Sequence, residues 1–146
     1  MKIAIGSDHG GYQLKERLKK YLKELNIEYK DFGCESEKSV DYPDIGFKVS
    51  NEVRKGNYER GILICGTGIG MSIVANKIKG IRASLCHDVF SAQKAREHTN
   101  ANILALGESV IGIGLAQEIV KIWLKTDYSQ KERHIRRLDK IKKIEG

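Results

Sequence analysis

The segment Gly61-Ile-Leu-Ile-Cys-Gly-Thr-Gly-Ile-Gly-Met-Ser-Ile73 decides the fold, because it joins an apolar strand to a helix through a glycine-rich turn. The apolar run ends in Cys65, and glycines follow at positions 66, 68 and 70. Glycine lets the backbone bend sharply and direct its amide groups toward an anion, and the helix N-terminus adds partial positive charge. This pattern predicts an anion-binding turn.

Cys65 stands where the strand meets this turn. A thiol beside a helix N-terminus forms its thiolate more readily, which favours a base or a nucleophile next to an oxyanion cradle. Two plainer interpretations stay open: the glycines serve only close packing, and the cysteine packs as a small apolar residue. The spacing completes neither the phosphate loop G-x-x-x-x-G-K-[ST] nor the dinucleotide pattern G-x-G-x-x-G.

The remainder of the chain repeats the unit of strand, turn and helix. Apolar runs and helical periodicity predict five strand–helix pairs and a tail helix, which together indicate a parallel sheet with helices on both faces. We expect an α/β fold, a Rossmann-like three-layer sandwich with a five-stranded parallel sheet and a C-terminal helix, as one domain over residues 1–146. The predicted strands are 2–7, 27–32, 61–65, 82–86 and 103–106, and residues 98–102 are predicted to form a polar turn.

Asp8 and His9 follow the first predicted strand directly. Ligands of open parallel sheets bind outside the carboxyl ends of the strands, so both residues are candidates for ligand binding. Asp8 as an N-cap of the next helix and His9 as a solvent-exposed turn residue are the alternatives.

Composition narrows the class of protein. The chain has 146 residues and contains no window of eighteen apolar residues, the length that a membrane-spanning helix needs. The sequence begins without a signal-peptide pattern, so we expect a cytoplasmic protein. Three cysteines are an odd number and favour free thiols, and no Cys or His spacing predicts a metal site.

Positive charge gathers near the C-terminus. The net charge is +7, and the last sixteen residues hold seven Lys and Arg against three Asp and Glu, or +4. No nucleic-acid motif or interleaved aromatic pattern accompanies this charge, so nucleic acid is not an expected partner. Arg133 and Arg137 are four apart and share one helix face, which suits a phosphate clamp, although a solvated basic face has the same pattern. The single apolar stripe predicts that the tail helix, about 130–145, packs on the body or on a partner subunit.

With these residues in view, the sequence resembles ribose-5-phosphate isomerase type B, in the wider sugar-phosphate isomerase family that includes galactose-6-phosphate isomerase subunits. The resemblance spans nearly the whole chain. It is carried by Ile-Gly-Ser-Asp8-His9-Gly-Gly, Val40-Asp41-Tyr42-Pro43, the Cys65 segment, Asn76-Lys77, Gly80-Ile-Arg82-Ala, Arg96-Glu-His98, Ala101-Asn102-Ile-Leu-Ala-Leu-Gly and Arg133-His134-x-x-Arg137.

The resemblance implies interconversion of ribose 5-phosphate and ribulose 5-phosphate through a cis-enediolate, in the non-oxidative pentose phosphate pathway, without a metal or organic cofactor. Cys65 is then the base, His98 assists ring opening, and the enediolate oxygen lies on Thr67 and the backbone of Gly66, Gly68, Ile69 and Gly70. The sugar is bound by Asp8, His9 and Thr99, and the phosphate by Arg133 and Arg137. The family is dimeric or tetrameric, and each site draws residues from two subunits.

Two positions depart from the family pattern. Thr99-Asn100 stands where the family usually has Asn-Asp, and Lys131-Glu132 stands where it usually has Gly-Gly. The first change replaces or loses a substrate contact, and the second leaves the position of the phosphate clamp open. An isomerase of a hexose 6-phosphate, allose or galactose 6-phosphate, and a non-catalytic module that binds a phosphate ligand are therefore kept as alternatives.

Overall fold

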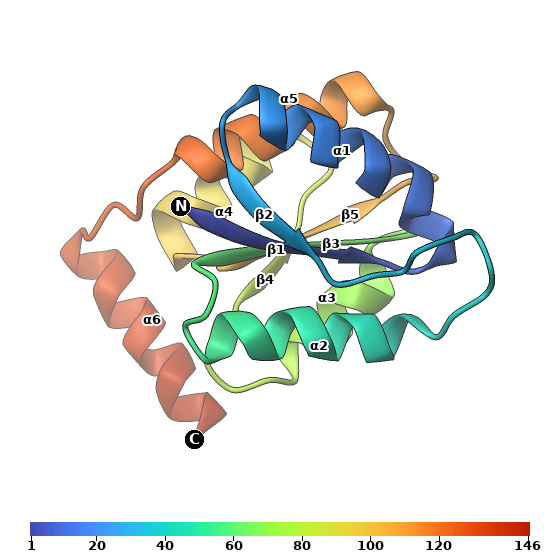
Figure 1. The fold of residues 1–146 in the computed structure, drawn as a ribbon. Coiled ribbons are helices and arrows are strands. Elements are labelled where there is room, and N and C mark those ends of the chain that lie inside the picture. Colours follow the sequence, from blue (N-terminus) through green and yellow to red (C-terminus); the bar gives the residue numbers. More distant parts are fainter.

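The computed structural model describes residues 1–146 and contains a five-stranded parallel sheet in the order β2-β1-β3-β5-β4 (Figure 1). The α/β class, the parallel sheet and the C-terminal helix that the sequence predicts are confirmed. The strands are β1 Lys2–Ser7, β2 Glu28–Asp31, β3 Arg60–Cys65, β4 Ala83–Leu85 and β5 Ile103–Gly107. The helices are α1 Tyr12–Glu24, α2 Tyr42–Arg54, α3 Ile69–Asn76, α4 Val89–Thr99, α5 Ile113–Lys125 and α6 Glu132–Glu145, with a 3₁₀ turn over His9–Gly11.

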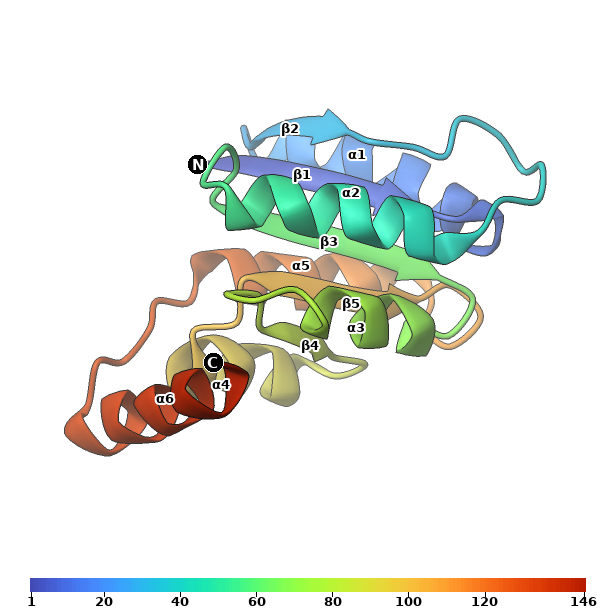
Figure 2. The same ribbon diagram turned by 90° about the horizontal axis from the view of Figure 1, so that it is seen from below.

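Strand periodicity divides the core into two layers. Side chains of the central strands alternate between the two faces, so Ile62 and Ile64 of β3 enter one apolar cluster while Leu63 and Cys65 enter the other. The first cluster joins the sheet to α1, α4 and α5, and the second joins it to α2 and α3. Figure 2 shows α2 and α3 together on one side of the sheet and α1 and α5 on the other. Cys65 therefore faces the layer of α2 and α3.

Several element boundaries differ from the sequence prediction. Strands β2 and β4 are each one residue shorter at both ends, β3 begins one residue earlier and β5 ends one residue later. His98 lies in the last turn of α4, which extends to Thr99 because Asn100 adopts a left-handed backbone conformation with φ 48° and ends the helix. The predicted turn therefore begins two residues later. Helix α3 ends at Asn76. None of the helices is both long and apolar enough to cross a membrane.

Helix α6 lies beside the body of the molecule, away from the arrowheads of the strands (Figure 1). Among the helices and strands it contacts mainly α4, and its C-terminal end accepts hydrogen bonds from Lys79 and Gly80. Leu138 is its one buried apolar side chain. Ile135, Ile141 and Ile144 of the same helix stay exposed. The apolar stripe of α6 is thus only partly covered within one chain.

Candidate active site

Cys65 ends β3 at the carboxyl edge of the sheet, and only 5% of it is exposed to solvent. Its Sγ accepts a hydrogen bond of 3.1 Å from the amide of Gly68, the N-cap of α3. The thiol therefore lies at the positive end of helix α3, against a backbone N–H. The predicted placement of the thiol at an anion-binding turn therefore has a physical basis in the structure.

The shape of the Cys65 turn requires glycine at two positions, Gly68 within it and Gly107 opposite it. Gly68 has φ 77°, a left-handed conformation, and a Cβ there would lie 2.8 Å from the carbonyl carbon of Leu106. Gly107, opposite Cys65 in the register, would place a Cβ 2.6 Å from the backbone of Thr67. The turn is therefore pressed against the end of β5.

Not every amide of the turn is free to bind an oxyanion. The Gly68 amide is used by Cys65 Sγ, and the Ile69 amide donates to Thr67 Oγ1 at 3.2 Å. The Thr67 hydroxyl thereby keeps its own proton for donation. Gly70 lies in the first turn of α3, where helical amides have no partner within the helix. Of the predicted cradle, the Thr67 hydroxyl proton and the amides of Gly66 and Gly70 therefore remain available to a ligand.

The turn that carries Asp8 packs against the Cys65 turn. The Asp8 side chain is 7% exposed and accepts a hydrogen bond of 3.1 Å from the Gly11 amide, so it caps the short 3₁₀ turn, as the N-cap alternative predicts. A Cβ on Gly10 would lie 3.3 Å from the amide nitrogen of Gly66. Capping and ligand binding are compatible, because a carboxylate has two oxygens.

A pocket of about 420 Å³ opens at this edge of the sheet, and we call it the Cys65 pocket. It brings together six of the predicted site residues, and sequence reasoning missed two others, Tyr42 and Ile73. The Tyr42 ring packs over Gly70, where a Cβ would approach it to 2.7 Å. The Asp41-Tyr42-Pro43 sequence, which opens α2 at the same edge, was the available signal for Tyr42. The pocket is lined by Asp8, Tyr42, Cys65, Gly66, Thr67, Ile69, Gly70 and Ile73.

His9 is exposed at the same edge, on the 3₁₀ turn after β1. The amide of Val40 donates a hydrogen bond of 3.2 Å to its Nδ1. Because Nδ1 accepts, the ring proton of neutral His9 belongs on Nε2, which makes that atom a donor.

A second group forms what we call the His98 cluster. It contains the predicted site residues His98, Arg133 and Arg137, with Ser129 and His134 beside them. The rings of His98 and His134 stack with centroids 4.4 Å apart. His134 is 3% exposed, and its Nδ1 is hydrogen-bonded to the hydroxyl of Ser129. The amide of Ser129 in turn donates to the carbonyl of Glu97, which ties the link before α6 to α4.

Cations surround His134 in this cluster. Burial is the largest cause that lowers the pKa of His134, and the charges of His98, Arg133, Lys131 and Arg137 lower it further. Arg133 and Arg137 are exposed on α6, free to receive an anion from outside the chain. Thr99 is exposed next to His98, and its hydroxyl donates to the carbonyl of Ala95 at 2.6 Å.

The Cys65 pocket and the His98 cluster lie at opposite ends of the sheet. Cys65 pairs with Gly107 at the carboxyl end of β5, whereas α4, which carries His98, leads into Ile103 at the amino end. The strand alone separates these ends by about 13 Å at about 3.3 Å per residue. Figure 1 shows α6 at the end opposite the strand arrowheads. The chain therefore brings its predicted site residues together in two groups and does not join them.

The fold and the Cys65 pocket define an α/β protein with a thiol on a glycine-rich turn, at the edge where such sheets bind ligands. The family described as Ribose/Galactose Isomerase matches residues 3–141. The chain belongs to this family and is a sugar-phosphate isomerase.

Similar proteins act on more than one sugar phosphate. The chain is 54% identical to a ribose-5-P isomerase B of Listeria innocua, over 88% of this chain and 87% of the relative. It is 43% identical to a D-erythrulose-4-phosphate isomerase of Pectobacterium atrosepticum, over 88% and 85%. The solved structure of ribose-5-phosphate isomerase B from Clostridium thermocellum superimposes with a TM-score of 0.97 at 53% identity, over 99% of this chain and 97% of that one.

Proposed function

We propose that the protein interconverts ribose 5-phosphate and ribulose 5-phosphate, with Cys65 as the base. The observation that carries this proposal is the Gly68 amide on Cys65 Sγ, inside a pocket that also offers the Thr67 hydroxyl. A thiolate beside hydrogen-bond donors suits proton abstraction next to a carbonyl, because the charge moves from sulfur to the substrate oxygen. The ribose-5-phosphate isomerase B relatives support the choice of the pentose.

The proposed reaction conserves every atom of the sugar. The Cys65 thiolate removes the proton from C2 of the open-chain aldose, and the electron pair forms a C1–C2 double bond while charge develops on O1. Thr67 and the Gly70 amide hold this enediolate oxygen. The proton of the C2 hydroxyl passes to O1, the thiol returns its proton to C1, and the electron pair left on O2 forms the C2 carbonyl of the ketose. One well-placed donor to such an oxyanion typically contributes about 3–4 kcal/mol to the transition state.

His98 and the arginines of α6 serve the parts of the substrate that Cys65 does not reach. The His98 imidazole is suited to give a proton to the ring oxygen of the cyclic sugar and to receive it again. Arg133 and Arg137 would hold the phosphate by charge-assisted hydrogen bonds. Asp8 and His9 would bind sugar hydroxyls beside the Cys65 pocket.

This division of roles requires two chains. The Cys65 pocket and the His98 cluster are at opposite ends of one sheet, so a substrate that touches both must lie between the pocket of one protomer and the cluster of another. Ile69 and Ile73 at the pocket and Ile135 and Ile141 on α6 are exposed apolar side chains that a partner would cover. We therefore propose a homodimer, or a homotetramer, with shared sites.

A substrate panel tests the proposal. Purified protein is assayed with ribose 5-phosphate, D-erythrulose 4-phosphate and allose 6-phosphate, each with and without a metal chelator, and Cys65→Ala serves as the inactive control. We expect the highest kcat/KM on the pentose, unchanged by chelator. A higher value on the four-carbon or six-carbon sugar would overturn the choice of substrate, and loss of activity with chelator would overturn the metal-free mechanism.

The four-carbon sugar is the second candidate, because a relative 43% identical to this chain is a D-erythrulose-4-phosphate isomerase. The same thiol and oxyanion donors serve either substrate, since both reactions move a proton between neighbouring carbons. Thr99 lies beside His98 and departs from the family pattern. It is therefore the position where a preference for the five-carbon or the four-carbon sugar could be set.

A further inference from the structure

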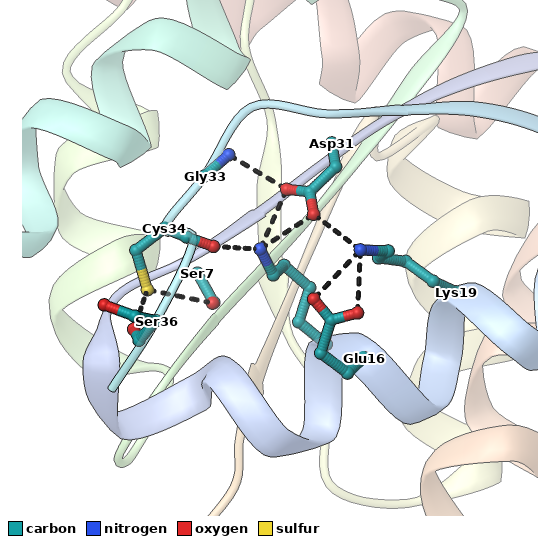
Figure 3. Close-up of polar contacts among 8 residues, drawn as sticks. Ser7, Glu16, Lys19, Asp31, Gly33, Cys34 and Ser36 are labelled. Carbon is teal, nitrogen blue, oxygen red and sulfur yellow. Dashed lines mark hydrogen bonds and ion pairs between the residues drawn. The ribbon is translucent and has the colours of Figure 1, made fainter. Parts of the chain in front are cut away.

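A fully buried lysine lies behind the turn that carries Asp8 and His9. Lys15 of α1 has no exposed surface, and its Nζ donates to both carboxylate oxygens of Asp31, at 2.8 and 2.9 Å, and to the carbonyl of Cys34. An ammonium group has three protons, so this set satisfies all of them. Figure 3 shows this group of contacts at the end of β2.

Asp31 has further partners. It accepts hydrogen bonds of 2.9 Å from Nζ of Lys19 and from the amide of Gly33. Burial raises the pKa of the Asp31 carboxyl, but the hydrogen bonds from Lys15, Lys19 and Gly33 outweigh it, and the pKa is lowered. The carboxylate therefore keeps two partners when Lys15 is removed, whereas the structure gives the Cys34 carbonyl no donor besides Lys15.

The segment 31–34 that Lys15 holds is itself bonded to the end of β1. The Ser7 amide donates to the Gly33 carbonyl, and the Cys34 amide donates to the Ser7 carbonyl, both at 2.7 Å. The thiol of Cys34 donates to the carbonyl of Ser36 at 3.2 Å and lies 3.9 Å from the Ser7 hydroxyl. Ser7 directly precedes Asp8, so this pairing sets where the Asp8–His9 turn begins.

The turn is thus fixed on both sides by the same segment. On the N-terminal side of the Asp8–His9 turn, the backbone of Ser7 is hydrogen-bonded to Gly33 and Cys34. On its C-terminal side, Lys15 of α1 donates hydrogen bonds to Asp31 and Cys34. The loop that leaves Cys34 also comes back to the turn, where the Val40 amide meets Nδ1 of His9. Lys15 touches neither the Cys65 pocket nor the substrate region, so any influence on the site passes through this turn.

We propose that Lys15 is a positioning residue of the active site: its ammonium, by fixing segment 31–34 against Ser7, holds the Asp8–His9 turn and keeps His9 as a hydrogen-bond donor at Nε2. The part that concerns turnover rests on the proposed isomerase function. A displacement of the turn by a fraction of an ångström would move Asp8 within the Cys65 pocket and release His9 from Val40, and small misplacements of this kind reduce catalysis strongly.

The chain offers a matched control on the same helix. Lys15→Met removes the ammonium and keeps the length of the side chain, while Lys19→Met removes the other lysine of Asp31 but leaves the Cys34 carbonyl bonded. We expect Lys15→Met to lower kcat/KM by about 10- to 100-fold, mainly through kcat, and Lys19→Met to change it less than about threefold. The ¹⁵N spectrum of the His9 ring should show the Nε2–H tautomer in wild type and Lys19→Met, and a tautomer mixture in Lys15→Met.

A second variant separates positioning from folding. Lys15→Met/Asp31→Asn removes the buried charge imbalance, while the Asn oxygen still accepts from the Gly33 amide, so stability should recover if Lys15→Met folds poorly. Activity and the His9 tautomer should not recover, because the Cys34 carbonyl stays unbonded. Wild-type kcat/KM and an unchanged His9 spectrum in a folded Lys15 variant would overturn the inference. If the wild-type protein turns over none of the sugar phosphates, the proposed function fails, and the His9 spectra still decide the role of Lys15.

Discussion

The Cys65 pocket and the His98 cluster differ in the kind of group that each presents. The pocket offers a buried thiol, the Thr67 hydroxyl and a helix N-terminus, with no cationic side chain among its lining residues. The cluster offers two stacked imidazoles and the exposed guanidiniums of Arg133 and Arg137. In the proposed site, the Cys65 pocket would stabilise negative charge that develops on the substrate during the reaction. The His98 cluster would bind the permanent negative charge of a phosphate.

This difference matches the two ends of a sugar phosphate. The carbons that exchange a proton need a base and donors preorganised toward the oxygen on which charge develops. The phosphate needs permanent positive charge. Since the sheet separates the two regions, the proposed site joins them only when protomers meet, which makes assembly a condition for catalysis.

The strongest test of this division mixes two inactive variants. Cys65→Ala and His98→Asn should each lower kcat/KM about 10³-fold, because each removes a proton-transfer group. In a mixed dimer, isolated through different tags on the two chains, one site carries both changes and the other carries neither. We therefore expect the mixed dimer to regain about half of the wild-type activity.

The homodimers of each variant, prepared through the same tags, are the control. If the mixed dimer stays as inactive as its parents while it remains dimeric, each site is built within one chain and the proposed division between protomers is wrong.

A second test concerns the rigidity of the Cys65 turn. Gly68→Ala forces a left-handed residue to carry a Cβ and brings that atom to 2.8 Å from the backbone of Leu106. We expect the free energy of unfolding to fall by about 2–4 kcal/mol, from the conformation and from overpacking. Gly66→Ala is the matched control, because a Cβ there meets nothing within 4 Å. Equal stability of the two variants in urea titrations would show that the turn adapts.

Local features of the chain could be predicted from the sequence, but contacts between residues distant in the chain could not. The strand that ends in Cys65 and the glycine turn are local, so periodicity and turn chemistry were sufficient to find them. Lys15 can be buried because Asp31, in strand β2, pairs with its ammonium group. The position of Lys15 beside the apolar stripe of α1 did not reveal this pairing. The stacking of His98 on His134 joins residues far apart in the chain, and only the tertiary structure shows it.

The stability of the His98 cluster should depend on pH through His134. Burial and neighbouring cations lower the pKa of His134, so below about pH 6.5 the unfolded chain binds more protons than the folded one. The contribution of His134 to stability is thus complete above that pH and is lost as the pH falls toward its folded pKa. His134→Asn keeps an acceptor for the Ser129 hydroxyl and should flatten this dependence.

The measurement is the free energy of unfolding of both proteins in urea, from pH 8 to pH 5. We expect the difference between wild type and His134→Asn to shift in favour of the variant as the pH falls. A difference that stays constant over this range would mean that His134 gains a proton as readily in the folded protein as in the unfolded chain.

The smallest effect is expected at Thr99, on the rim of the His98 cluster. Its hydroxyl already donates to the Ala95 carbonyl within α4, so only its oxygen remains for a ligand. Thr99→Asn restores the side chain usual in the family and adds a free amide donor, which should raise kcat/KM on ribose 5-phosphate by about two- to tenfold, the value of one net hydrogen bond. Thr99→Val keeps the shape without the hydroxyl and should stay within about twofold of wild type, because the lost bond is internal to the helix. A large loss in Thr99→Val would instead place the hydroxyl on the substrate, and a gain of Thr99→Asn on D-erythrulose 4-phosphate alone would link this position to the four-carbon sugar.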